Sequence, residues 1–196
     1  MNRISLLLTA LMLPLFALAQ SGISRNSTRL GVDLATLDAP DDIGRRLTGR
    51  LARHLGNDRV VVALEAGYMR IRSANLLFNE VDPGPDRRER YTADLTAFYD
   101  FLKTPRHALR VGAGMSAWYR RDDIYRGASA QFSPNGLQVV AINRTMRNAL
   151  NTGVHFATEY EWLFDPRWGV DVRLRIANLE GAGISSMLGA GISRRF

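Results

Sequence analysis

The sequence predicts an all-β fold in which antiparallel strands follow one another in up-and-down order. Apolar and polar residues alternate in one segment after another along much of the 196-residue chain, and a period of two is typical of a strand with two unlike faces. Glycine, proline and aspartate gather between these segments, as they do in turns. The chain has no cysteine, so no disulfide framework can hold the strands together.

Residues 1–19 predict a secretory signal peptide, and residues 20–196 a single mature domain. A short positive region precedes an apolar run at 4–18, and residues 17–19 have the A-x-A form of a cleavage site. An uncleaved membrane anchor is the alternative, but a spanning helix needs about 20 apolar residues, and Pro14 interrupts this run. The mature part has no second run of that length, so it can cross a membrane only as strands.

The first predicted strand is clear and the second is ambiguous. In segment 27–37, Leu30 and Val32 alternate with small and polar residues. In segment 41–55 the apolar residues fall four apart, which fits a helical stripe as well as alternate residues of a strand. These residues are Ile43, Leu47, Leu51 and Leu55.

Five further segments show the alternation plainly. They are 60–72, 91–101, 109–119, 150–162 and 170–176. Short turns are predicted at 103–107 and 164–168, and a tight connection at 180–183. Long loops are predicted at 73–89 and 122–148, where proline, glycine and arginine are frequent. Loops of this length are often functional.

The last segment, 184–196, predicts a strand that closes a barrel. Its apolar face carries Leu188, Ala190, Ile192 and Phe196, with Arg194 as the one charged residue on that face. An aromatic last residue on an apolar face resembles the assembly signal of bacterial outer-membrane β-barrels, whose last strand pairs with the first. In this chain such pairing would remove both edges of the sheet.

Three features indicate that the polar faces point into a narrow lumen and the apolar faces toward lipid. Glycine is frequent on the polar faces, where it makes room inside a barrel. Aromatic residues gather near both ends of the apolar faces, as at two bilayer interfaces. Charges of both signs share the polar faces and can pair across a lumen. The predicted lumen residues are Glu65, Asp94, Arg110, His155, Glu159, Glu161, Asp171, Arg173 and Arg175.

Within this set, we expect four residues on neighbouring strands to form one cross-strand network, because a five-residue turn joins those strands. They are Glu159, Glu161, Arg173 and Arg175.

The number of strands follows from the loops. If the short turns and the C-terminus lie on one side of a membrane, strand 60–72 runs away from that side. An N-terminus on the same side then requires a strand at 41–55, which gives eight strands.

With these eight strands, a signal peptide and a terminal Phe196, the chain resembles the small bacterial outer-membrane barrels of the OmpX and OmpW type. The resemblance implies a monomer in the outer membrane that contacts lipid and lipopolysaccharide, is recognised by the barrel-assembly machinery, and has no cofactor. A secreted soluble β-barrel or sandwich, which would bury the apolar faces, is the alternative.

The sequence predicts no catalytic residues and no metal site. His155 and Glu159 share a polar face, but position 157 is alanine, where lipid-hydrolysing barrels carry the serine of a His-x-Ser arrangement. We therefore expect His155 and Glu159 to be structural. The three histidines lie too far apart in the sequence to suggest a metal motif.

Two classes of function remain. The barrel is a structural or interaction protein with a lumen filled by charged side chains, or a small pore or carrier for hydrophobic or small solutes. An eight-stranded barrel encloses little more than its own side chains, which favours the first.

The net charge of +7 comes almost entirely from arginine. An exported chain meets lipid phosphates rather than nucleic acid, and arginine binds phosphate through a bidentate fork. We therefore expect lipopolysaccharide contacts by Arg87, Arg88, Arg120 and Arg121.

Overall fold

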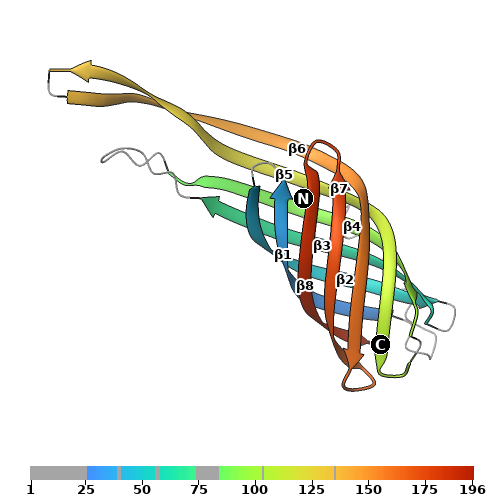
Figure 1. Cartoon of the computed structure of the whole chain (residues 1–196). Helices are drawn as coiled ribbons and strands as arrows, with labels where there is room; N and C mark the ends of the chain where they lie inside the picture. Colours follow the sequence, from blue (N-terminus) through green and yellow to red (C-terminus); the bar gives the residue numbers. More distant parts are fainter. Residues whose placement is uncertain (1–25, 39–40, 56–57, 74–83, 103, 135) are drawn as a thin grey trace, which may run out of the picture.

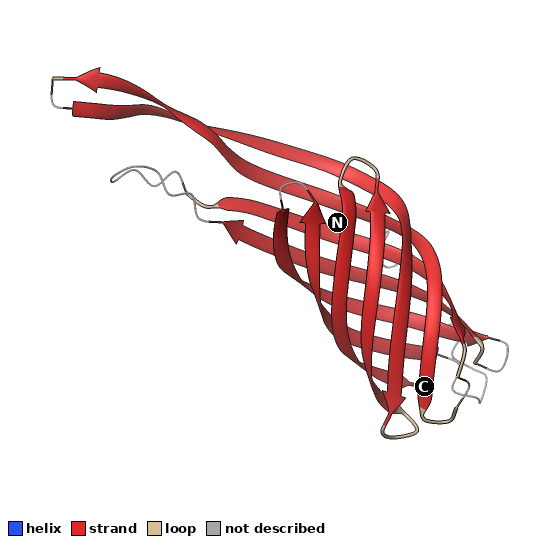
Figure 2. Cartoon of the chain, viewed as in Figure 1, coloured by secondary structure: helices blue, strands red, loops and turns tan. Residues whose placement is uncertain are grey.

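The described part of the chain is built entirely from strands and the turns that join them (Figure 2). The computed structural model describes residues 26–38, 41–55, 58–73, 84–102, 104–134 and 136–196. Residues 1–19, the predicted signal peptide, lie outside this part. Within the described residues, no helix is long and apolar enough to cross a membrane.

Eight strands form one closed antiparallel barrel. They are β1 (Asn26–Asp38), β2 (Asp41–Leu55), β3 (Val60–Ser73), β4 (Asp86–Asp100), β5 (His107–Ser133), β6 (Gly136–Leu163), β7 (Trp168–Leu179) and β8 (Gly183–Arg195). Each pairs with the next in the sequence, and β8 pairs with β1. The prediction of an eight-stranded up-and-down barrel is confirmed.

The ambiguous segment 41–55 is the strand β2, which pairs with β1 on one side and β3 on the other. Its four-residue spacing arises because the outward positions between its apolar residues hold Arg45, Gly49 and Arg53. Apolar residues on alternate outward positions of a strand recur every four residues, which imitates a helical stripe.

The barrel closes where its two ends meet. Leu30 of β1 lies opposite Ile192 of β8 in the register. The amide of Asn26 donates to the carbonyl of Phe196 at 3.2 Å, and the amide of Phe196 donates back to the carbonyl of Asn26 at 2.9 Å. This reciprocal pair extends the β1–β8 ladder to the last residue of the chain.

The two ends of the barrel differ in the length of their connections (Figure 1). The turns at 101–106 and 164–167 lie at the end that also holds the C-terminus, which we call the turn end. At the opposite end, β5 and β6 run on together far past the other strands. We call residues 124–133 and 136–145 the ribbon, and that end of the barrel the ribbon end.

The prediction of a long loop at 122–148 is wrong. The segment is an extended hairpin that pairs from Asp122 opposite Arg147 as far as Ser133 opposite Gly136. Beyond Asp123, β5 has lost its other neighbour β4, so neither face of the hairpin rests on a core that would impose alternation. Register shifts at Tyr125/Gly127 and Ser129/Ala130 also break the period of two. The loop predicted at 73–89 is likewise shorter than expected, since β4 begins at Asp86.

The apolar faces of the strands point outward and the charged faces inward. Leu30 is 73% exposed, whereas Asp33 on the same strand is completely buried. Large apolar residues cover the outside of every strand, and charged residues make up much of the buried set. This distribution is the reverse of that in a soluble barrel and matches a barrel in lipid.

Candidate functional site

The middle of the lumen contains a group of ion pairs that we call the central network. Its members come from five strands and are Asp33, Arg46, Glu65, Asp94, Arg173 and Arg175. The guanidinium of Arg46 lies 3.2 Å from Asp33 and 3.1 Å from Glu65. It also reaches Asp94 at 2.5 Å. One arginine of β2 thus joins carboxylates of β1, β3 and β4.

Two arginines of β7 complete the central network from the opposite wall. Arg173 donates to both carboxylate oxygens of Asp33 at 3.0 Å and also binds Glu65. Arg175 lies 2.7 Å from Asp94 and 3.4 Å from Glu65. Each carboxylate therefore faces at least two arginines, which offsets the cost of removing the charges from water.

A second group of ion pairs lies nearer the turn end, and we call it the turn-end network. Arg110 donates to Glu159 at 2.8 Å and to Glu161 at 2.6 Å. Arg50 binds Glu159 from across the lumen, and Arg195 of the last strand binds Glu161 at 2.7 Å. These pairs join β2, β5, β6 and β8.

The four residues expected to form one network, Glu159, Glu161, Arg173 and Arg175, form their ion pairs in two different groups. Glu159 lies opposite Arg173 in the register of β6 and β7, yet the two glutamates belong to the turn-end network and the two arginines to the central network. The lumen is narrow enough for an arginine to reach the far wall. Arg173 therefore pairs across the lumen and not with its register neighbour, whereas Arg110 with Glu159 and Asp33 with Arg46 pair directly opposite one another in the register.

The remaining predicted lumen residues are also buried in the interior. Asp171 accepts a hydrogen bond from Arg29 at 2.6 Å. The two ring nitrogens of His155 contact Thr96 and Ser116, each at 2.8 Å, and Arg175 lies 3.0 Å from the same ring. His155 has no hydrogen bond to Glu159. Arg29 is a lumen residue that was not predicted, although the alternation that places Asp33 inside the barrel places Arg29 there too.

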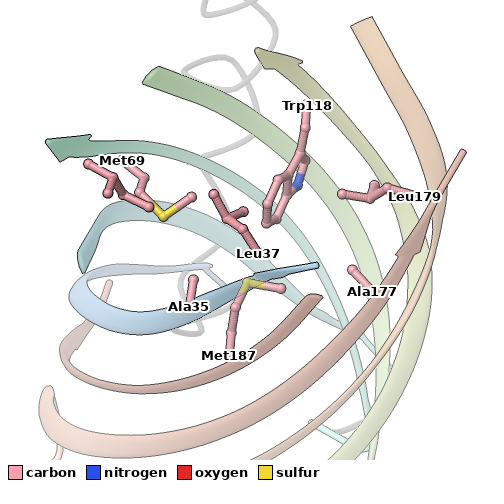
Figure 3. Packing of buried hydrophobic residues seen from close by; sticks show 8 residues of the cluster. Ala35, Leu37, Met69, Trp118, Ala177, Leu179 and Met187 are labelled. Carbon is pink, nitrogen blue, oxygen red and sulfur yellow. The ribbon is translucent and has the colours of Figure 1, made fainter. Parts of the chain in front are cut away.

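A layer of apolar side chains points into the lumen on the ribbon side of the central network (Figure 3). It comprises Ala35, Leu37, Met69, Ile71, Trp118, Ala177, Leu179 and Met187. The ring of Trp118 links this layer to the charges beneath it: Arg46 lies 5.7 Å from the ring centroid, and the indole donates to Asp94 at 3.4 Å. This apolar layer was not predicted from the sequence.

Glycines on the inner faces allow the charged side chains to fit. A Cβ atom at Gly189 would lie 1.9 Å from a carboxylate oxygen of Asp33, and one at Gly191 would lie 2.5 Å from the guanidinium of Arg29. A Cβ at Gly67 would meet Arg46 at the same distance. The absence of a side chain at these positions is therefore a packing requirement of the filled lumen.

The four arginines predicted to contact lipopolysaccharide divide into two pairs. Arg87 and Arg121 are exposed on the outer face, whereas Arg88 and Arg120 are buried on the inner face. The division follows from pairing: β4 and β5 remain regular strands here, so consecutive residues point to opposite sides. All four arginines therefore lie on regular strands.

Arg144 fastens the ribbon to the barrel rim. Its guanidinium donates to Asp123 at 2.8 Å and to the carbonyl of Pro85 at 2.9 Å. It also donates to the carbonyl of Gly84 at 3.3 Å. One side chain of β6 thereby holds the start of β4 against β5, which no local sequence pattern indicates.

Near the turn end, a buried serine and histidine have the pairing of a hydrolytic site. The hydroxyl of Ser27 lies 3.1 Å from a ring nitrogen of His54, and the other ring nitrogen lies 3.5 Å from Asp58. Ser27 and His54 are both buried inside the barrel, so an ester cannot reach the hydroxyl without moving the surrounding strands. Within the described residues, no group of three histidine or acidic side chains could hold a metal ion.

No model of a known protein family matches this sequence, and no curated protein matches it either. Solved structures resemble its fold. Neisserial surface protein A (NspA) is 14% identical over 87% of this chain and 96% of its own, with a TM-score of 0.59. Ail of Yersinia pestis, solved with the heparin analogue sucrose octasulfate, is 12% identical over 88% of this chain and 97% of its own, with a TM-score of 0.55.

A third similar structure is the outer-membrane protein OprG of Pseudomonas aeruginosa. It is 10% identical over 88% of this chain and 96% of its own, with a TM-score of 0.53. All three comparisons cover nearly the whole of the known barrel, and the closed order of eight strands is the same architecture. The chain has the fold of the small eight-stranded outer-membrane β-barrels of bacteria.

Proposed function

We propose that the chain is a monomeric surface protein of the bacterial outer membrane, with a sealed lumen and an outer rim that binds lipopolysaccharide. The observation that carries this proposal is the combination of an apolar exterior with an interior full of paired charges. In this proposal, residues 1–19 direct export and are removed, and the ribbon end faces the outside of the cell, where such barrels carry their longer connections.

The last strand supplies the signal for assembly in this proposal. Leu188, Ala190, Ile192 and Phe196 are exposed on the outer face of β8, where the barrel-assembly machinery can recognise them. Arg194, which departs from the apolar pattern, has its guanidinium 5.4 Å from the centre of the Trp168 ring. A cation on an aromatic face suits the membrane interface, so this arginine is compatible with a lipid-facing strand.

Two features support a structural or interaction role over transport. The central and turn-end networks cross the lumen from wall to wall, and the apolar layer lies over the central network (Figure 3). An ion would have to displace several paired charges and then pass a dry constriction. The proposal is therefore a barrel that does not conduct and has no enzymatic activity.

The outer surface near the ribbon end offers a site for lipid phosphates. Tyr68, Tyr91 and Tyr119 form a row of rings with centroids 5.1 Å and 6.4 Å apart, typical of the bilayer interface. Exposed arginines lie two or four residues beyond this row along their strands, with Glu89 and Asp123 among them. They are Arg70, Arg72, Arg87 and Arg121, which we call the outer arginines.

The fold comparison adds limited support for an anionic ligand. Ail, which shares the fold, was solved with a polysulfated molecule. For the present chain, the outer arginines match the phosphates of lipopolysaccharide, because guanidinium groups form charge-assisted, paired hydrogen bonds with such groups.

The lipopolysaccharide proposal is tested by replacing all four outer arginines with glutamine in the full-length protein. Binding of lipopolysaccharide to the refolded barrel should become weaker and less sensitive to salt, since fewer phosphate contacts remain to be screened. Heat-modifiable migration on electrophoresis confirms that the variant still folds. Unchanged affinity and salt response would show that these arginines are only solvated.

Conductance distinguishes the sealed barrel from the alternative of a small pore. The purified protein, added to a planar lipid bilayer, should give no reproducible channel events. The double variant Trp118→Ala with Met187→Ala removes two large side chains of the apolar layer, and its conductance is measured in the same way as a control. Regular channels in the wild-type protein would favour a pore or carrier and overturn the proposed sealed lumen.

A further inference from the structure

A cluster of arginines lines the inner face of the barrel wall at the ribbon end. Its residues lie in two adjacent rows across the strands. In one row Arg90 lies opposite Arg120. In the next row Asp122 lies between Arg88 and Arg147. We call Arg88, Arg90, Arg120 and Arg147 the mouth cluster. They share one face of the sheet because they occupy alternate positions on β4, β5 and β6.

For Arg120 and Arg147, the nearby carboxylates among the described residues are engaged elsewhere. Asp122 forms an ion pair with Arg90, and Asp86, two residues from Arg88, accepts a hydrogen bond from the amide of Tyr125 at 2.7 Å. The positive charges of Arg147 and Arg90 repel the Arg120 guanidinium, and the carboxylate of Asp122 attracts it.

Arg120 differs from the arginines deeper in the lumen. It is 7% exposed and its Nε atom lacks a hydrogen-bond partner, as in Arg50 and Arg110, but unlike those two residues it forms no ion pair among the described residues. Within the described residues, neither Arg120 nor Arg147 forms a hydrogen bond or ion pair of its own, whereas Arg46, Arg110 and Arg173 each bind two carboxylates or more. A buried guanidinium without a partner is costly unless a ligand supplies the missing charge.

The apolar layer forms the floor beneath the mouth cluster. Trp118 precedes Arg120 by two residues on β5, and Met69 lies opposite Arg90 in the register. A floor of this kind excludes water on one side and strengthens the attraction between the arginines and a bound anion. It also separates the mouth cluster from the central network, whose carboxylates are already paired.

We propose that the mouth cluster is a binding site for a sulfate or phosphate monoester group of a water-soluble ligand, with Arg120 and Arg147 as the principal contacts. Two guanidinium groups can present paired donors to a tetrahedral oxyanion. Arg147 is exposed and accessible to the ligand from outside, while Arg120 holds the group against the wall. The site does not involve the outer arginines, which lie on the outer face of β3, β4 and β5.

The test compares two double variants with the same change in charge. Arg120→Gln with Arg147→Gln alters the mouth cluster, and Arg87→Gln with Arg121→Gln alters the outer arginines. Sucrose octasulfate is the soluble probe, titrated calorimetrically into the refolded full-length protein in detergent. Lipopolysaccharide is the second ligand, so that a lipid headgroup and a soluble ester can be distinguished.

The mouth variant should lose about tenfold or more in affinity for sucrose octasulfate, because two charge-assisted hydrogen-bonding groups are removed. Its lipopolysaccharide binding should stay unchanged. The outer variant should retain its affinity for sucrose octasulfate within about threefold, since its arginines act only through screened long-range charge.

Three results would overturn the proposed site. They are unchanged affinity for the octasulfate in the mouth variant, an equal loss in both variants, and no wild-type binding below about 1 mM. An equal loss would mean that net charge alone attracts the probe. Heat-modifiable migration must be retained, and Arg147→Gln alone provides a milder variant, because that side chain is exposed.

Discussion

Arginine plays opposite parts in two regions of the same lumen. In the central network, Arg46 reaches three carboxylates and Arg173 reaches two. In the mouth cluster, on the ribbon side of Trp118, neither Arg120 nor Arg147 has a hydrogen-bond or ion-pair partner among the described residues. In the central network and in the mouth cluster alike, the residue is arginine and it lies on the inner face of the barrel wall. The presence of facing carboxylates therefore distinguishes arginines that hold the barrel together from arginines that are available to a ligand.

The largest effect is expected where the pairing is complete. Arg173→Leu leaves Asp33 and Glu65 with too little positive charge in a dry interior, so the free energy of unfolding should fall by about 3–5 kcal/mol. Urea unfolding in detergent or lipid measures it. Arg121→Leu, on the exposed outer face, should change stability by less than about 0.5 kcal/mol. Equal stability of Arg173→Leu and wild type would mean that water fills the central network.

The next effect concerns the outer surface in the middle of the membrane. Leu95 of β4 is 51% exposed on the outside of the barrel, and Leu95→Arg should destabilise the protein by about 2–4 kcal/mol in lipid. Phe164→Arg, in the turn after β6, should cost less than about 1 kcal/mol because the headgroup region accepts charge. If unfolding in lipid vesicles shows equal costs for both changes, the apolar face is not embedded.

A smaller effect is expected from crowding in the lumen. Gly189→Ala would place a Cβ atom 1.9 Å from Asp33, and over-packing of this kind should cost about 1–3 kcal/mol. At Gly49, by contrast, a Cβ atom would meet only Leu30, at 3.8 Å. Gly49→Ala should therefore stabilise the protein, by about 0.4–1 kcal/mol. Equilibrium unfolding of both variants compares the two faces of the sheet, and a neutral Gly189→Ala would show that the lumen has spare room.

The smallest effect should come from the mouth cluster and should have the opposite sign. Arg120→Gln removes a buried charge that has no partner, so the free energy of unfolding should rise by up to about 1 kcal/mol. The measurement requires protein from which bound anions have been removed. A loss of stability would show that Arg120 is held by contacts within the protein, and the contrast with Arg173 would disappear.

The eight strands and the direction of their faces could be predicted from the sequence, because alternation is a local signal. It placed Glu65 and Asp94 inside the barrel correctly. The ribbon could not be predicted, since strands with two exposed faces show no alternation and two bulges shift their phase. The partners of Arg173 were also beyond the sequence. They depend on which side chains of distant strands meet across the lumen, and the register of neighbouring strands does not determine that.

The hydrogen bonds between Asn26 and Phe196 have a consequence for how the chain folds. Every other strand pairing joins neighbours in the sequence and can form by local hairpin closure, but this seam joins residues from opposite ends of the described chain. Contacts of such sequence separation form slowly. Two salt bridges, Arg173 with Asp33 and Arg29 with Asp171, connect β7 with β1 and cannot form in an open sheet. Folding should therefore pass through an unclosed sheet whose inner charges remain hydrated, and expulsion of water from the lumen should coincide with closure of the seam.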